Sequence, residues 1–450
     1  MKQSLSLTAP PALWKAIQSD LLSTPDLERA AVGFAGVNDA GGATRLLLRD
    51  WAPVSVDEYL VQLGNHLEVS PVFWARAAKR ARATNESLVI MHSHPRDAGS
   101  PRFSHSDDAG ERLLVPGLRA RAGVPVAAVV VSPGGATARH ADGGTATPIE
   151  LSIVGGPSVR VANMVKGDAF DRQVRALGKE GQMLLRSLTV GVVGAGGLGS
   201  HVIQQLVHLG VGRVIVIDPD RVADTNLSRL VGASRLDVWL HRKKTRVAQR
   251  LSRRLHRLTE VVPVSRSVME PAVGRRLLDC DVVIGCTDNQ FSRVVLNTLA
   301  FQYYIPVMDL GVELQISGAM GGRVAWLAPG HACLWCMGIL DSERVRIEQL
   351  PQATRDEEVA RGYIQGVEEP APAVVSINGV VASLGVTEVL ARFTGFAGTE
   401  PRGSLLMYRL RDGVVRRTTP SAVADCPTCS CSGLLGMGDL ASSPWPGALG

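Results

Sequence analysis

The stretch from Leu188 to Ser200 constrains the fold more than any other part of the chain. Leu188–Val193 is mostly apolar and β-branched, which predicts a buried strand. Gly194, Gly196 and Gly199 then form a GxGxxG turn, and the apolar spacing beyond it predicts a helix packed on a sheet. Glycine is needed because backbone N–H groups must approach a phosphate, with a helix N-terminus close behind. The stretch therefore predicts a Rossmann-like, doubly wound α/β domain that binds an adenine nucleotide.

A second strand, Arg213–Ile217, ends in Asp218, where a carboxylate would reach a ribose hydroxyl. Alone, this pattern is most typical of NAD-binding proteins. The polar residues downstream favour a nucleotidyl transferase instead, since Arg and Lys neutralise a triphosphate and an Asp holds Mg²⁺ at the reacting phosphate. The candidate nucleotide contacts are Gly194, Gly196, Gly197, Gly199, Asp218, Asp220, Asn226, Arg229, Lys244 and Asp288.

Residues from about 165 to 435 resemble the ThiF/MoeB family, whose adenylating fold is shared with ubiquitin-activating enzymes. The resemblance rests on strings that occur in order: FDRQVRALGKEGQ, VGVVGAGGLGS, IDPDRVADTNLSR, KKTRVA, DVVIGCTDNQFSR and CLWC…CPTC. It implies that ATP and Mg²⁺ convert the C-terminal glycine of a ubiquitin-like or sulfur-carrier protein into an acyl adenylate. In that comparison Arg229, Lys244 and Asp288 are catalytic. The alternative for Asp288 is a helix cap at Asp288-Asn289.

The resemblance also concerns Arg172. In the family this arginine belongs to an N-terminal helix and reaches the ATP of the partner subunit. If Arg172 has that role, the protein is a homodimer, and the alternative is a surface arginine. Relatives that form a carrier thioester use a cysteine on a crossover loop, expected here within residues 338–373, and this stretch has none. Cys280 and Cys286 read as core residues. We therefore expect the reaction to stop at the adenylate, with transfer to a conjugating enzyme's thiol or to a sulfur donor.

Four of the seven cysteines form two CxxC pairs, Cys333/Cys336 and Cys426/Cys429. Four thiolates make a closed tetrahedral zinc site, so we expect this zinc to be structural.

The first part of the chain carries a second constellation. A predicted strand, Ser87–Met91, runs into His92 and His94, and Asp107 opens the next helix. In a strand His-x-His places both imidazoles on one face. Two His and one carboxylate with a fourth position open suit a catalytic Zn²⁺, which lowers the pKa of bound water to about 7. The alternative is two ordinary histidines and a helix N-cap aspartate.

This constellation resembles the JAMM (JAB/Mov34) metallopeptidase family, in which an upstream Glu precedes HxH and SxxD. The resemblance implies that His92, His94 and Asp107 bind zinc, that Glu28 is the general acid/base, and that Ser104 donates to the oxyanion. The loop before Ser104 is longer than in the family, which leaves Asp107 or Asp108 as the third ligand.

Length and composition fit a multidomain enzyme of 450 residues. We expect a JAMM-like domain over 1–155, a linker over 156–165, a ThiF-like domain over 166–436 and a flexible tail over 437–450. No long apolar run or signal peptide is evident, so we expect a cytoplasmic protein with no membrane partner. Much of the net charge of +6 lies in 235–257, which we interpret as a solvated helix face, not a nucleic-acid site.

These features favour a bifunctional enzyme of a bacterial ubiquitin-like pathway. One half would cleave the carrier from a precursor or conjugate, and the other would adenylate its C-terminus; the resemblance to such fused proteins extends to antiviral defence. Two alternatives remain open. One is the same chemistry in sulfur transfer, and the other is a non-catalytic nucleotide-binding scaffold with two zinc sites.

Overall fold

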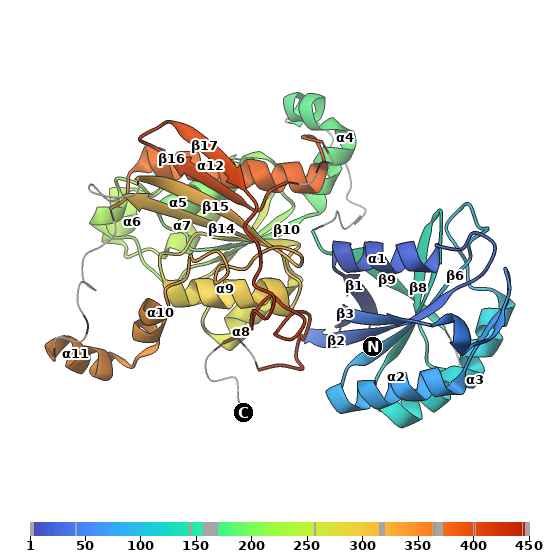
Figure 1. Cartoon of the computed structure of the whole chain (residues 1–450). Coiled ribbons are helices and arrows are strands. Elements are labelled where there is room, and N and C mark those ends of the chain that lie inside the picture. Colours follow the sequence, from blue (N-terminus) through green and yellow to red (C-terminus); the bar gives the residue numbers. More distant parts are fainter. Residues whose placement is uncertain are drawn as a thin grey trace. The chain divides into compact units, whose positions relative to one another are not determined.

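The computed structural model divides into two compact units, which are described separately (Figure 1). The residues described are 4–40, 43–143, 146–155, 170–255, 258–314, 320–361, 364, 372–398, 400, 402–442 and 444–445. The expected linker, 156–165, lies outside them. The first unit contains Met1–Val154 with two later segments, and the second contains the rest of the chain.

The first unit is a closed barrel with strand order β1-β3-β2-β6-β7-β8-β9. Its strands are β1 (Ser4–Ala9), β2 (Ala30–Ala40), β3 (Ala43–Pro53), β6 (Ser87–Ser93), β7 (Val126–Ser132), β8 (Gly135–His140) and β9 (Thr147–Ile153). Its other elements are α1 (Pro11–Leu21), α2 (Pro71–Thr84), α3 (His105–Ala122), the short helix η1 (Val56–Glu58) and the hairpin β4 (Tyr59–Gln62) with β5 (Leu67–Val69). The strand expected over Ser87–Met91 forms as part of β6.

Alternation along β6 separates two cores. Val89 and Met91 pack with residues of α1, whereas Leu88 and Ile90 pack with residues of α2 and α3. In Figure 1, α1 covers one side of the strands and α2 and α3 cover the other. Because side chains alternate with period two, His92 shares the face of Ile90 and points towards α3.

Two later segments, Gln302–Tyr304 and Ser430–Ser442, belong to the first unit. Asp439 N donates to Val37 O at 2.6 Å, and the Tyr304 hydroxyl donates to Leu48 O at 3.0 Å. Residues 437–442, expected as the start of a flexible tail, instead make backbone hydrogen bonds within this unit.

The second unit has an eight-stranded sheet with the order β12-β11-β10-β13-β14-β15-β16-β17. The strands are β10 (Thr189–Val193), β11 (Arg213–Ile217), β12 (Glu260–Val264), β13 (Val282–Gly285), β14 (Val307–Leu314), β15 (Met320–Leu327), β16 (Leu405–Arg409) and β17 (Val414–Thr418). The first five in this order are parallel and the last three join in antiparallel pairs. The order reverses between β10 and β13, and doubly wound folds bind ligands at such a switch point.

Helices cover both faces of this sheet, as the doubly wound prediction requires; α5 and α12 lie on one face and α9 on the other in Figure 1. The helices are α4 (Asp171–Ser187), α5 (Gly197–His208), α6 (Arg235–Trp239), α7 (Lys244–Leu255), α8 (Pro271–Gly274), α9 (Gln290–Gln302), α10 (Ser342–Gln349), α11 (Gln352–Ala360) and α12 (Val375–Thr394), with the short turns η3 (Asp224–Asn226) and η4 (Arg275–Asp279).

Among the described residues, α12 alone is long and apolar enough, by length and composition, to cross a membrane. Half of that window is buried, and α12 packs on α5, β14 and β15. It therefore has the surroundings of a core helix in a doubly wound sheet.

Candidate functional site

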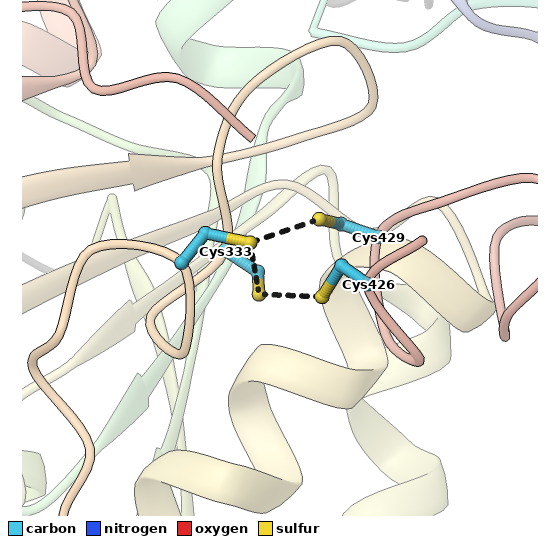
Figure 2. Close-up of side chains that lie close together, drawn as sticks. Cys333, Cys426 and Cys429 are labelled. Carbon is cyan, nitrogen blue, oxygen red and sulfur yellow. Dashed lines mark hydrogen bonds between the residues drawn. The ribbon is translucent and has the colours of Figure 1, made fainter. Parts of the chain in front are cut away.

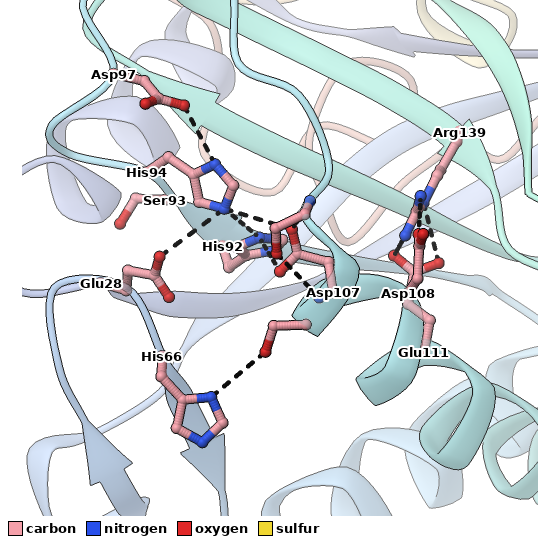
Figure 3. Close-up of polar contacts among 12 residues, drawn as sticks. Glu28, His66, His92, Ser93, His94, Asp97, Asp107, Asp108, Glu111 and Arg139 are labelled. Carbon is pink, nitrogen blue, oxygen red and sulfur yellow. Dashed lines mark hydrogen bonds and ion pairs between the residues drawn. The ribbon is translucent and has the colours of Figure 1, made fainter.

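The first candidate site lies where β6 ends and α3 begins (Figure 3). His92 Nε2 is 3.2 Å from His94 Nε2 and 3.1 Å from Asp107 Oδ1, and His94 Nε2 is 3.5 Å from Asp107 Oδ2. One ligand atom from each residue lies within 4.8 Å of the others. Two imidazoles and a carboxylate at this spacing fit the three-ligand set of a catalytic zinc site.

Asp107 reaches this site through the helix cap. Ser104 Oγ accepts from Asp107 N at 3.1 Å, and the Asp107 carboxylate accepts from Ser104 N at 2.5 Å. The alternative that Asp107 is the helix N-cap is wrong, because the N-cap is Ser104. Asp107 lies three residues later, and its second carboxylate oxygen faces His92. Asp108 is turned away and accepts from Arg139 Nη1 at 2.7 Å. Of the two aspartates left open by the sequence, Asp107 is the one beside the histidines.

Glu28 faces the same cluster from the segment before β2. Its Oε1 atom is 3.8 Å from His94 Nε2, and the residue is 6% exposed. Burial raises the pKa of the Glu28 carboxyl, and the nearby His92 and His94 oppose that rise only in part. A buried carboxylate with a raised pKa is suited to taking up and releasing a proton.

A groove of about 770 Å³ opens beside this cluster. Glu28, His92 and Asp107 line it, together with apolar side chains of the β4–β5 hairpin, α2 and α3. The apolar members include Leu60, Leu67, Val69, Trp74, Leu113 and Leu118. The polar cluster therefore borders a groove whose walls are largely apolar.

The second candidate site surrounds the turn between β10 and α5. A Cβ at Gly199 would lie 1.8 Å from Gly194 O, and Gly194 has a φ of 92°, so both positions require glycine. A Cβ at Gly194 would lie 2.6 Å from Cys286 O, so the turn rests against the chain leaving β13. The N-terminus of α5 thus opens at the carboxyl edge of the sheet, where its dipole favours a phosphate.

Asp218 ties the end of β11 to this turn. Its Oδ2 atom accepts from Ala195 N at 2.7 Å, and its Oδ1 atom accepts from Asp220 N at 2.8 Å. Burial raises the pKa of Asp218, and the positive charge of Lys244 works against that rise. Each carboxylate oxygen can accept a second hydrogen bond, so these contacts are compatible with a ribose hydroxyl.

Lys244 comes to the turn from the first residue of α7, and Arg229 comes from the turn that follows η3. Lys244 Nζ is 2.7 Å from Asp220 Oδ2 at the start of α7. Arg229 Nη1 donates to Thr225 O at 2.6 Å, and a Cβ at Gly197 would lie 3.0 Å from Arg229 Cδ. Asn226 Oδ1 accepts from Ala223 N at 3.0 Å, so this side chain shapes its own turn.

Asp288 is exposed directly after β13. The helix-cap alternative is wrong for Asp288, because Asn289 Oδ1 accepts from Ser292 N at 2.7 Å, and Glu348 accepts the first amides of α9. Among the described residues, no hydrogen bond or ion pair engages the Asp288 carboxylate. Arg293 Nη2 donates to Thr287 O at 2.6 Å and holds the preceding backbone.

Arg172 is exposed in the first turn of α4. Its contact with a partner subunit stays a prediction.

The four CxxC cysteines form the third cluster (Figure 2). Cys333 Sγ is 3.7 Å from Cys336 Sγ and 3.6 Å from Cys426 Sγ, and Cys336 Sγ is 3.7 Å from Cys429 Sγ. Four sulfurs around one zinc at about 2.3 Å would be about 3.8 Å apart, so the spacing fits a structural zinc. Val423 N also donates to Cys336 Sγ at 3.3 Å.

Cys280 and Cys286 are not candidates for a thioester. Burial raises the pKa of both thiols above the usual range. Both thiols therefore stay protonated and weakly nucleophilic. Cys280 is a core residue as expected, whereas Cys286 is half-buried.

Two residues near these sites carry no sequence motif. Asn378 is 4% exposed, and its Nδ2 atom would lie 2.6 Å from a Cβ at Gly197. In the sequence, Asn378 could have been noticed only as an amide side chain within a mostly apolar helical stretch. Arg139, which contacts Asp108, had no signal beyond its charge.

The model of the ThiF family matches residues 170–430, which is more than half of the chain. The chain belongs to the ThiF family. It is 29% identical over 275 residues to the SAMP-activating enzyme E1 of Haloferax volcanii, covering 61% of this chain and 92% of that protein. It is 32% identical over 271 residues to a sulfur carrier protein adenylyltransferase of Thermus thermophilus, covering 58% and 90%. The molybdopterin-synthase adenylyltransferase of Escherichia coli is 26% identical over 241 residues, covering 53% and 86%.

The glycine turn should tolerate a methyl group at one position and not at another. Gly199→Ala places a Cβ against Gly194 O, whereas a Cβ at Gly196 meets nothing within 4 Å. We expect Gly199→Ala to lower the free energy of unfolding by about 1–3 kcal/mol or more. Gly196→Ala is the matched control and should change it by less than about 0.5 kcal/mol. Urea unfolding without nucleotide measures both, and equal stabilities would contradict the packing argument.

The cysteine cluster should account for one bound zinc. Cys333→Ser removes a ligand and should reduce the zinc content by one ion per chain and lower the melting temperature, because structural zinc contributes to folding. Cys431→Ser changes an exposed cysteine outside the cluster and should leave both values unchanged. Elemental analysis and thermal unfolding measure these quantities. Unchanged zinc in Cys333→Ser would exclude the site.

Proposed function

We propose that the second unit uses ATP to adenylate the C-terminal glycine of a ubiquitin-like or sulfur-carrier protein. Arg229 and Lys244 beside the glycine turn of a ThiF-family domain, with Asp288 on the segment that leaves β13 next to Gly194, support this proposal. The relatives named for activation of SAMP, for adenylation of a sulfur carrier and for adenylation of molybdopterin synthase support the same class of reaction.

The chemistry is a nucleotidyl transfer. A carboxylate oxygen of the carrier attacks the α-phosphorus of ATP, the bond from that phosphorus to the bridging oxygen breaks, and pyrophosphate leaves. Asp218 would hold the ribose, and Lys244 and Arg229 would neutralise charge on the phosphates. Lys244 would exchange its present partner, Asp220, for a phosphate oxygen. The free carboxylate of Asp288 would hold Mg²⁺, which offsets charge at the reacting phosphate.

The activated tail would then pass to another molecule. The described part of residues 338–373 contains α10 and α11, and the rest of that stretch lies outside the described residues. With no cysteine in the stretch, we propose direct transfer to the thiol of a conjugating enzyme or to a sulfur donor. If Arg172 contacts the nucleotide of a partner subunit, the active form of the protein is a homodimer.

We propose that the first unit is a JAMM-type zinc peptidase that acts on the same carrier. The spacing of His92, His94 and Asp107 beside the buried Glu28 carries this proposal. Zinc held by these three residues would polarise the water that attacks the peptide bond. Glu28 would take the proton of that water and return it to the leaving amine, and Ser104 would donate to the oxyanion.

Together the two activities would release and then energise one C-terminal tail. The bacterial ubiquitin-like pathway, with its link to antiviral defence, is the first assignment. Sulfur transfer is the second, and the name of the Thermus thermophilus relative favours it. A gene for a conjugating enzyme beside this one would favour the first.

Removal of the Asp288 carboxylate should abolish activation. We expect Asp288→Ala to slow carrier-dependent ATP–pyrophosphate exchange by at least about 100-fold, since the phosphate charge loses its metal-binding group. Asp279→Ala changes another exposed aspartate, located just before β13, and should leave exchange unaltered. The carrier for this assay would be a small protein with a glycine-ending tail, sought among the genes that flank this one. Normal exchange by Asp288→Ala would refute the assignment.

Glu28→Gln should separate metal binding from catalysis. We expect cleavage of a carrier extended beyond its terminal glycine to fall by about 100-fold or more, because proton transfer is lost. Zinc content should remain that of the wild type, since Glu28 is not one of the three ligands. Glu150→Gln, which changes an exposed carboxylate on β9 outside the groove, is the control and should cleave normally. Full cleavage by Glu28→Gln would remove Glu28 from the mechanism.

A further inference from the structure

Arg139 on β8 is a buried arginine beside the candidate zinc cluster. Its Nε atom donates to both carboxylate oxygens of Glu111 at 3.1 Å, and its Nη1 atom donates to Asp108 Oδ1 at 2.7 Å. Figure 3 shows these contacts on the side of α3 away from Glu28. A guanidinium that is only 8% exposed needs such anionic partners, because an unpaired buried charge is costly.

Both partners lie in the first two turns of α3, and Asp108 directly follows Asp107. The two ion pairs therefore fix how far the helix N-terminus extends from the barrel and how it is rotated. That rotation decides whether the Asp107 carboxylate faces the histidines. A shift of the helix by one residue position would turn Asp107 by about 100°, since an α-helix has about 3.6 residues per turn.

Arg139 also supports the histidine side of the cluster. Its guanidinium carbon lies 3.7 Å from the centre of the Phe103 ring. The Phe103 ring contacts the His92 ring edge-on, with centroids 6.2 Å apart and planes at 63°. One side chain thus touches the segment that holds Asp107 and, through Phe103, the imidazole of His92.

We propose that Arg139 is a positioning residue for the zinc site, which pre-organises His92 and Asp107 without touching the metal. This inference rests on the proposed zinc peptidase function of the first unit. Partners behind metal ligands fix the ligands' orientation, and their loss typically weakens metal binding by about 10–100-fold. The role belongs to the side chain's planar fork and its stacking, which lysine cannot supply.

The test is zinc affinity of the full-length protein, measured by competition with a chromogenic chelator. Arg139→Met and Arg139→Lys should both bind the first-unit zinc about 10–100-fold more weakly, while the zinc of the cysteine cluster is retained as an internal reference. Arg119→Met is the matched control. Arg119 lies in the last turn of the same helix, donates to Asp142 O at 3.0 Å, and should leave the affinity unchanged.

Wild-type zinc affinity in both Arg139 variants would overturn the proposal. If Arg139→Met does not fold, Asp108→Asn removes one ion pair with little change in volume. It should weaken zinc binding several-fold, and an unchanged affinity would again overturn the proposal. His92→Ala identifies the first-unit zinc. If the wild type and His92→Ala bind the same number of zinc ions, the proposed metal site itself has failed.

Discussion

Both candidate active sites depend on one constraint. Each lies where a buried strand ends and the chain continues towards a helix. Inside a sheet, the backbone donors and acceptors of a strand bond to the neighbouring strands. Polar groups without such partners therefore lie where the strand ends. In the first unit, β6 ends beside the first turn of α3. In the second, β10 ends at the glycine turn before α5, and β13 ends just before α9. Each junction brings side chains from distant parts of the chain to the free end of a helix.

At these junctions most carboxylates and amides are held by internal contacts. Asp218 accepts from two backbone amides, Asn289 caps α9, and Asn226 closes its own turn. These contacts make the surroundings rigid. Asp288 stands apart, because its exposed carboxylate has no hydrogen bond or ion pair with the described residues. Few charged groups are therefore available to a ligand, and the side chains around them are held in place by internal hydrogen bonds.

At the N-terminus of α3, the carboxylate of Asp107 belongs both to the helix cap and to the candidate metal site. The Asp107 carboxylate satisfies a backbone amide with one oxygen and faces His92 with the other. The cap fixes the carboxylate before any metal arrives, so the cost of ordering it has been met during folding. The inferred role of Arg139 is similar, since its ion pairs hold the helix that carries the cap and so help to fix the Asp107 carboxylate before metal binding.

Much of this arrangement was predictable from local pattern. The GxGxxG turn, the HxH pair and the two CxxC pairs each depend on short spacings. The strands that lead into the glycine turn and the HxH pair formed close to their expected bounds, whereas the CxxC pairs lie outside helices and strands. The loop before Ser104 left Asp107 and Asp108 equivalent. In the structure Asp107 lies beside His92, whereas Asp108 is ion-paired with Arg139, which lies on a strand beyond the end of α3.

The sequence by itself therefore determined the doubly wound second unit, its nucleotide turn and the residue types of each cluster, because these follow from strand and helix periodicity and from short motifs. Only the tertiary structure decided which aspartate faces the histidines, that Asn289 and not Asp288 caps α9, and that residues 437–442 join the first unit. Those outcomes depend on contacts between segments far apart in the chain, and no local pattern encodes the direction in which a side chain finds its partner.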